Sequence, residues 1–214
     1  MDAKLLVWAD ATAARGQRLR APEVDAKLLV WANAAAARGR RFPPIWLFTD
    51  SKRLRDPLGA VARLPRGRAG VVFRHDDAPD RVRLGRDIAR ICKARRLALV
   101  VAGDVRLSAT LRAGVHLRGG RWPGPIRRRC LVTSSAHSLP DLIRAAHAGA
   151  RIAFLAPVFA TESHPGAGSL GAARWSAVAR QAPVAVAALG GIDGTTVRRL
   201  PRWCRAVGAI GALA

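Results

Sequence analysis

The sequence predicts a single compact (β/α)8 barrel, and three observations lead to this expectation. About eight apolar runs of strand length follow Pro44, and Arg- and Ala-rich amphipathic segments of helical length separate them. Near-continuous apolar strands that alternate with helices are typical of a parallel sheet covered on its outer face. Eight such units within about 170 residues fit a small closed barrel. The strand count disfavours the main alternative, a doubly wound open sheet.

The expected elements follow one another in a regular order. Strands are expected at residues 45–49, 70–74, 98–102, 114–117, 131–135, 152–157, 184–189 and 206–210. Helices are expected at residues 54–63, 79–95, 107–112, 139–148, 172–180 and 194–199. Only residues 211–214 follow the last strand, so the eighth helix is expected to be missing or very short.

A repeat precedes the barrel and defines residues 1–43 as an N-terminal helical extension to the barrel of residues 44–214. Residues 2–9 and 25–32 both read DAKLLVWA, and an Ala-rich stretch ending in Arg-Gly follows each copy. The apolar residues have helical spacing, which predicts two short helices. We expect the second copy to pack into the vacant eighth-helix position. The first copy would extend that helix or mediate self-association, so a homo-oligomer is one expectation.

Composition argues against several other classes of protein. The net charge of +23 invites a nucleic-acid interpretation, but arginine is scattered along the whole chain and no tyrosine is present. The aromatic residues are not interleaved with the basic runs as a base-stacking platform requires, so nucleic acid is an unlikely partner. The longest uncharged runs fall short of a membrane span, and the N-terminus makes a poor secretory signal, so we expect a cytoplasmic protein. The three widely separated cysteines indicate neither disulfides nor a zinc site.

Glycine-rich turns mark the candidate anion site. Gly190-Gly191 follows the seventh strand and precedes a helix start, while Gly208 and Gly211 accompany the eighth strand. Barrels of this class commonly hold phosphate after strands seven and eight. Backbone amides at such a turn can approach an anion, and a tight turn without any ligand is the alternative interpretation.

Four segments at strand ends, in this order, resemble the thiamine phosphate synthase/TenI family. They are Val115-His116-Leu117, Ser135-Ala136-His137-Ser138, the run from Ala156 to Thr161, and Ala188-Leu189-Gly190-Gly191-Ile192. The opening Trp46-Leu47-Phe48-Thr49-Asp50 matches that family's first strand as well. The resemblance runs from about Pro44 to Ala214 and leaves the two repeats outside it.

The resemblance implies two activities. In the synthase, a pyrimidine diphosphate loses its leaving group with magnesium assistance, and thiazole phosphate captures the cation. Arg74 is retained here, Asp104 is the one plausible Mg ligand, and Thr161 and Ser163 keep the family's hydroxyls. However, Asp76 replaces a lysine, an expected acid is missing near Arg118, and His164 replaces another lysine. Synthase activity is therefore expected to be weak or absent.

The TenI branch includes a thiazole tautomerase whose acid/base is the His of a Ser-x-His motif, matched here by Ser135 and His137. Residues two apart on a strand point to the same side, so both can face the barrel mouth. The alternative is a histidine that only satisfies a neighbouring carbonyl group. Similarly, His75 and His164 can be solvated loop residues, and His116 can be structural.

The sequence thus predicts a thiamine-biosynthesis barrel that binds thiazole phosphate, a small phosphorylated substrate, at Gly190, Gly191 and Gly211. Thiazole tautomerisation by His137 would need no cofactor, whereas the synthase alternative would need Mg. A degraded paralogue that binds thiamine intermediates without turnover is the remaining alternative.

Overall fold

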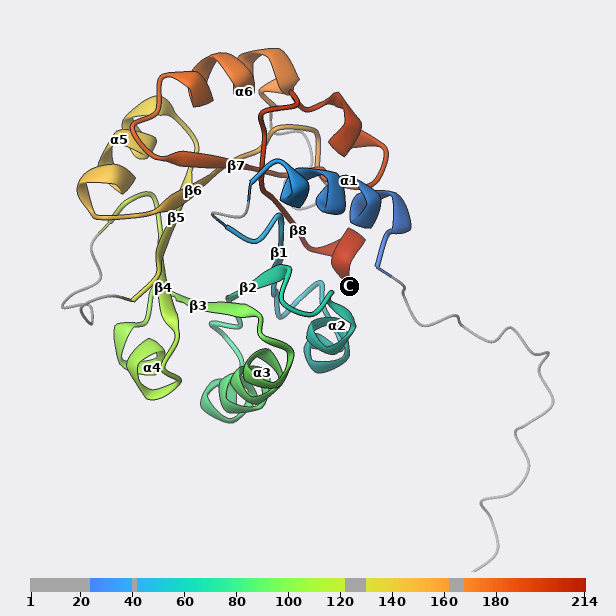
Figure 1. The fold of residues 1–214 in the computed structure, drawn as a ribbon. Helices are drawn as coiled ribbons and strands as arrows, with labels where there is room; N and C mark the ends of the chain where they lie inside the picture. Colours follow the sequence, from blue (N-terminus) through green and yellow to red (C-terminus); the bar gives the residue numbers. More distant parts are fainter. Residues whose placement is uncertain (1–23, 40–41, 122–129, 162–167) are drawn as a thin grey trace, which may run out of the picture.

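The computed structural model describes residues 24–39, 42–121, 130–161 and 168–214, which form a closed barrel of eight parallel strands (Figure 1). The strands are β1 (Ile45–Phe48), β2 (Ala69–Phe73), β3 (Ala98–Ala102), β4 (Gly114–Leu117), β5 (Val132–Ala136), β6 (Ile152–Leu155), β7 (Ala185–Leu189) and β8 (Val207–Ala209). Each strand pairs with the next in the chain, and β8 closes the barrel on β1, with Ile45 opposite Val207. The predicted barrel is confirmed, and no strand end differs from its prediction by more than two residues.

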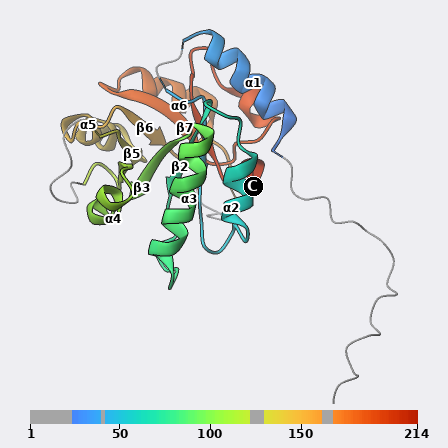
Figure 2. The same ribbon diagram turned by 60° about the horizontal axis from the view of Figure 1, so that its bottom comes forward.

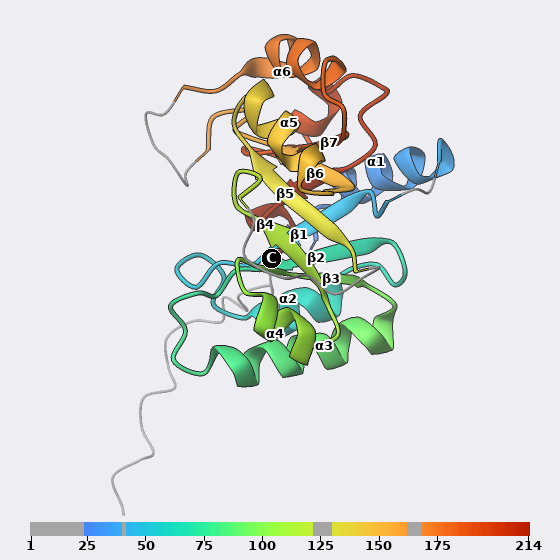
Figure 3. The ribbon, with the colours of Figure 1, turned by 90° about the vertical axis from the view of Figure 1, so that its left-hand side faces the viewer.

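Helices cover the outside of the barrel. They are α1 (Ala26–Ala37), α2 (Pro57–Arg63), α3 (Arg81–Arg95), α4 (Val105–Thr110), α5 (Leu139–His147), α6 (Gly171–Arg180) and the short 3-10 helices η1 (Thr196–Arg199) and η2 (Gly211–Leu213). Figure 2 shows α2 and α3 side by side along one flank. In Figure 3 the strands run between α5 and α6 on one side and α2, α3 and α4 on the other. No helix of the described residues is long and apolar enough to cross a membrane.

Side-chain caps fix where several of these helices begin. The Asp56 side chain accepts a hydrogen bond from Gly59 N–H at 2.8 Å, and the Asp104 side chain accepts one from Leu107 N–H at 2.8 Å. Such caps satisfy amide groups that have no partner inside the helix. The Asp104 cap also explains why α4 begins two residues earlier than the expected helix at 107–112.

The interior of the barrel is filled by aromatic side chains. Trp46 and Phe48 from β1 meet Phe154 from β6 edge to face, with ring centroids 5.6 and 4.9 Å apart. Gly208 of β8 leaves room for this cluster, because a Cβ at this position would lie 2.6 Å from the Phe48 ring. Core packing by itself therefore explains why residue 208 is glycine.

Helix α1, formed by the second copy of the repeat, lies beside β1 and β8 in the position where an eighth helix would pack (Figure 1). Its start is tied to the C-terminal ends of the strands, because Asp25 N–H donates to the Ala212 carbonyl at 3.0 Å. Its end lies at the opposite rim, where the Arg205 guanidinium donates to the Arg38 carbonyl. Leu28 is fully buried in the core. The first copy of the repeat lies outside the described residues.

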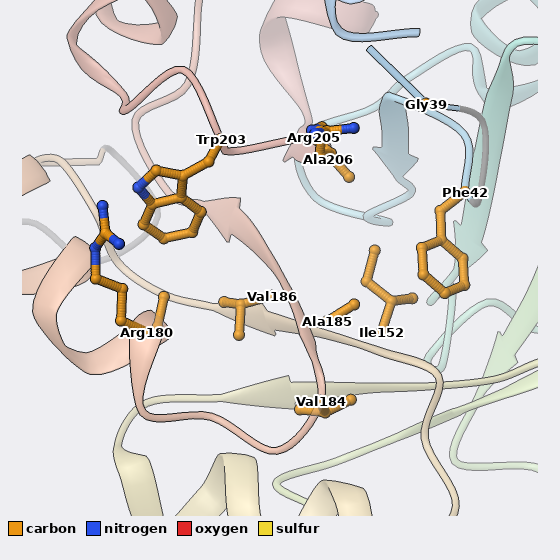
Figure 4. A pocket seen from close by; sticks show the side chains of 11 residues that line it. Gly39, Phe42, Ile152, Arg180, Val184, Ala185, Val186, Trp203, Arg205 and Ala206 are labelled. Atoms are coloured by element: carbon orange, nitrogen blue, oxygen red, sulfur yellow. The ribbon is translucent and has the colours of Figure 1, made fainter.

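The helix expected over residues 194–199 is the single 3-10 turn η1, which begins two residues later and ends at the predicted Arg199. Leu200 after it is extended, as is favoured before Pro201. The N-terminal part of β7 is partly exposed, and an apolar cavity of about 510 Å³ lies beside it (Figure 4). Phe42 and Trp203 flank this cavity, and the Arg180 guanidinium lies 5.0 Å from the Trp203 ring centroid.

Candidate functional site

A second and larger cleft, of about 1130 Å³, opens at the C-terminal ends of the barrel strands. This is the end at which barrels of this class carry their chemistry. Residues at the C-terminal ends of the strands, and in the loops that follow them, line the cleft. Of the predicted site residues, those that line it are Arg74, Ser135, His137, Thr161, Gly190, Gly191 and Gly211. Asp104 is not in the lining, and Ser163 and His164 lie outside the described residues.

The loop after β7 is built tightly around its two glycines. Gly190 and Gly191 have φ values of 96° and 62°, in the left-handed region that disfavours side chains. A Cβ on Gly191 would lie 2.3 Å from the Ala160 carbonyl oxygen, so the loop packs directly on the β6 loop. A bulky residue at 191 would therefore disturb the fold as well as any ligand, and this position cannot by itself test anion binding.

Several backbone amides of the β7 and β8 loops remain available to a ligand. Within the described part of the chain, the N–H groups of Gly191, Ile192, Gly211 and Ala212 donate to no protein acceptor, and all four residues line the cleft. Gly211 has open space around it, with no atom within 4 Å of the Cβ that a side chain would add. Unpaired amides on the loops after two neighbouring strands are the kind of surface that binds phosphate.

Asp25 connects α1 to this loop. One oxygen of its carboxylate caps α1 by accepting from Lys27 N–H at 2.9 Å, and the other accepts from Gly194 N–H at 2.7 Å. Asp193, an exposed residue of the same loop, accepts from the N–H groups of Thr195 and Thr196, both at 2.7 Å. The hydrogen bonds from Thr196 and Thr195 hold the pKa of Asp193 below its usual range. Both carboxylates are thus engaged with backbone amides.

The end of β5 presents the Ser-x-His motif to the cleft. Ser135 and His137 both line it, as expected for residues two apart on a strand. The Ser135 hydroxyl accepts from Gly119 N–H at 3.1 Å. His137 Nδ1 lies 2.9 Å from the Ala156 carbonyl oxygen, which can only accept, so Nδ1 carries the hydrogen. The neutral ring then has its lone pair on Nε2, which has no partner among the described residues.

Asp141 in the first turn of α5 fixes the backbone of this motif. Its carboxylate accepts from His137 N–H at 2.8 Å and pairs with the Arg144 guanidinium. Partial burial acts to raise the pKa of Asp141, but the hydrogen bonds from His137 and Ser138 and the charge of Arg144 outweigh it, so the pKa is lowered. Asp141 therefore remains ionised and positions His137 through the main chain.

Two other histidines are buried and neutral. His116 lies on the floor of the cleft, where its Nδ1 meets the Thr133 hydroxyl at 2.8 Å. Burial, with the charges of Arg74 and Arg118, lowers the pKa of His116 to about 3. His75 is stacked on Phe73 and bonded to the Thr49 hydroxyl at 2.9 Å, and burial lowers its pKa too. These contacts support the structural interpretation of His116, whereas His75 is not the solvated loop residue that the sequence suggested.

A cluster of charged residues occupies the ends of β2, β3 and β4. The Arg81 guanidinium donates to Asp104 Oδ2 at 2.8 Å and to Asp76 Oδ1 at 3.1 Å, and Arg118 pairs with the other oxygen of Asp76. Since the remaining Asp104 oxygen caps α4, both carboxylates are already engaged. No group of three or more potential ligand residues within the described ranges is placed to hold a metal ion. The residues present do not fit magnesium, because both carboxylates are already paired or bonded within the protein.

The structure adds cleft residues that the sequence analysis did not assign. Lys52 and Arg53, in the loop after β1, bring positive charge to the lining. Asp25 also lines the cleft, although it belongs to the N-terminal extension that precedes the segment resembling the family. Arg74 pairs loosely with Asp50, its Nη2 lying 3.7 Å from the carboxylate. Nothing in the sequence pattern marks Lys52 or Arg53, because isolated basic residues in this arginine-rich chain carry no signal.

Comparisons with known proteins agree with this architecture. The family described as thiamine monophosphate synthase matches residues 46–210. A protein of Aquifex aeolicus (strain VF5), named "Putative thiamine-phosphate synthase 2", is 29% identical over 159 residues, which cover 70% of this chain and 86% of that protein. The solved thiamine phosphate pyrophosphorylase of Pyrococcus furiosus has a TM-score of 0.69 at 20% identity and covers 80% of this chain and 88% of its own. The corresponding structure from Bacteroides thetaiotaomicron has a TM-score of 0.50 at 15% identity, covering 80% and 84%. These structural likenesses show the fold alone.

Proposed function

Because the chain belongs to the thiamine monophosphate synthase family, we propose that it is a thiamine-biosynthesis enzyme that moves a proton on a bound thiazole phosphate, with His137 as the acid/base. The observation that carries this proposal is the shared cleft. Ser135 and His137 line the same cleft as the two loops with unpaired backbone amides, which supports the proposal. One end of the cleft can thus hold a phosphate while the other offers a base.

The phosphate would bind to the N–H groups of Gly191, Ile192, Gly211 and Ala212. Lys52 and Arg53 line the same cleft and would add favourable charge toward a dianion. Asp25 and Asp193 also lie here, but their carboxylates accept hydrogen bonds from backbone amides, which lessens their repulsion toward the ligand.

The proton transfer would use the free nitrogen of His137. With Nδ1–H held by the Ala156 carbonyl, Nε2 can take a proton from one position of the ring system and return it to another. The same carbonyl would stabilise the transient imidazolium through the Nδ1–H bond. No metal or organic cofactor takes part in this step.

The direct test is to incubate the protein with each isomer of the thiazole carboxylate phosphate and identify the products by NMR. We expect interconversion, and we expect His137→Gln to abolish it while leaving binding of the phosphate nearly intact. An active His137→Gln variant would return His137 to a structural role. Binding without turnover in the wild-type protein would favour the degraded paralogue.

Gly211 offers a cleaner test of the phosphate site than Gly191. A carboxylate introduced by Gly211→Asp would extend into open space and repel a phosphate, without backbone strain. We expect binding measured by calorimetry to weaken at least about tenfold, with the melting temperature unchanged. Ala177→Asp, on the exposed face of α6, adds the same charge outside the cleft and serves as the control. Equal affinity of the Gly211→Asp variant and wild type would contradict the assignment.

Synthase activity is the second candidate, and the cleft position of Arg74 and Ser135 favours it. The engaged carboxylates of Asp76 and Asp104 count against it, since the diphosphate leaving group needs neutralising ligands. Incubation with hydroxymethylpyrimidine diphosphate, thiazole phosphate and magnesium distinguishes the two candidates. Robust formation of thiamine phosphate would show that the synthase reaction is the main activity.

A further inference from the structure

The Arg81 side chain stands at the centre of a small set of oxygen ligands. Its guanidinium reaches Asp104 Oδ2 at 2.8 Å, Asp76 Oδ1 at 3.1 Å and the Ala102 carbonyl oxygen at 3.2 Å. Two carboxylates and a main-chain carbonyl, from the C-terminal end of β3 and the loops after β2 and β3, are oxygen ligands of the kind that a hard divalent cation prefers. Here one guanidinium contacts all three, and it comes from the first turn of α3.

Arg81 is held in this place by more than its ion pairs. Its side chain is only 17% exposed, and its guanidinium carbon lies 5.7 Å from the Phe73 ring centroid. The Asp76 and Asp104 carboxylates are 36% and 34% exposed, so both still reach the solvent at the rim. Partial burial strengthens the attraction between these groups, compared with ion pairs that are fully in water.

The charges of the cluster already balance. Asp76 and Asp104 supply two negative charges, while Arg81 and Arg118 supply two positive ones. A divalent cation could bind the two carboxylates only if Arg81 moved away, because the ion and the guanidinium would compete for the same oxygens and repel each other. Displacing a partly buried arginine would leave its charge without compensation, which is costly.

We propose that the Arg81 guanidinium is a built-in substitute for a divalent cation at the ends of β2 and β3, so that this barrel mouth is permanently metal-free. The proposal concerns the cation site, agrees with a reaction that needs no metal, and argues against the magnesium-dependent synthase reaction. Its consequence is that any turnover is insensitive to EDTA. A further consequence is that the two carboxylates become a cation site once the guanidinium is removed.

Binding of Mn²⁺ alone, followed by electron paramagnetic resonance and calorimetry, tests the proposal on the full-length protein. We expect no specific binding by the wild type at millimolar Mn²⁺. In Arg81→Ala we expect a new site, at least about tenfold tighter than any residual wild-type binding. Free guanidinium ion added to this variant should compete with Mn²⁺, since it can refill the place of the missing side chain. A purely structural role for Arg81 predicts no such competition.

The matched control is Arg83→Ala. Arg83 lies on the same helix and pairs with the exposed Asp80 at 2.6 Å, away from the oxygen ligands of Arg81. This variant should gain no Mn²⁺ site. Arg81→Lys, which keeps a positive charge, should also remain metal-free. Arg81→Gln, which removes the charge but keeps a long polar side chain, should gain the Mn²⁺ site and covers the case in which the alanine variant fails to fold. Wild-type binding of Mn²⁺ that Asp104→Asn abolishes would overturn the proposal, and so would a folded Arg81→Ala variant without a new site.

Discussion

Helix α1 provides the sharpest test of how the N-terminal repeat serves the fold. Leu28 is fully buried against the barrel, and Leu28→Ala removes three carbon atoms from this contact. At about 0.8 kcal/mol for each buried carbon group, the loss of transfer free energy is about 2.4 kcal/mol. The cavity left behind adds to this, so we expect about 3 kcal/mol, within the range measured for buried leucines. The melting temperature should fall by roughly 10 °C.

Urea unfolding followed by circular dichroism measures this change, and the repeat supplies its own matched variant. Leu5 is the equivalent of Leu28 in the first DAKLLVWA copy, and one eighth-helix position holds one helix. Leu5→Ala should therefore leave the free energy of unfolding unchanged. Val30→Ala, on the exposed face of α1, should change it by less than about 0.5 kcal/mol. A loss below about 1 kcal/mol for Leu28→Ala would refute the packing argument. Equal losses for Leu5→Ala and Leu28→Ala would show that the two copies share the position.

The remaining predictions concern the same helix and the buried histidine. Deleting residues 1–24 should be tolerated, whereas deleting residues 1–39 should expose the β1 and β8 flank and cause aggregation, as size-exclusion chromatography would reveal. An unchanged elution profile and melting temperature for the longer deletion would contradict this. Asp25→Ala should cost about 1–2 kcal/mol in urea unfolding, because α1 loses its cap and Gly194 N–H loses its acceptor. A negligible change would mean that solvent replaces both bonds. The pKa of His116 is about 3 in the fold and about 6.5 when unfolded, so the unfolded chain binds the extra proton and stability falls as the pH drops between these values. In His116→Gln, the slope of the free energy of unfolding against pH should therefore decrease by the equivalent of about one proton. An identical slope in the variant and the wild type would mean that the His116 ring is accessible to solvent.

Much of the barrel follows from local sequence. Mainly apolar runs such as residues 98–102 and 114–117 are strands at the predicted residues, because the strands of a helix-covered barrel are largely buried. The order of the strand-end motifs was enough to place Ser135, His137, Gly190 and Gly191 around one cleft. The sequence was less informative at helix starts: the Asp104 cap begins α4 two residues before the predicted start, and η1 begins two residues after its predicted start.

What the tertiary structure decided is which groups meet across the barrel mouth. Asp76 and Arg81 are five residues apart after β2, whereas Asp104 follows β3, and the pairing of β2 with β3 brings all three into one charge cluster. Likewise, the Nδ1 contact that sets the tautomer of His137 comes from the Ala156 carbonyl on the neighbouring strand's loop. The sequence by itself determined the strands, the cleft and the family resemblance, because these depend on local patterns of apolar residues and short motifs. Charge pairing, tautomer and access to backbone amides depend on distances of a few ångströms between separate segments, and folding alone sets those distances.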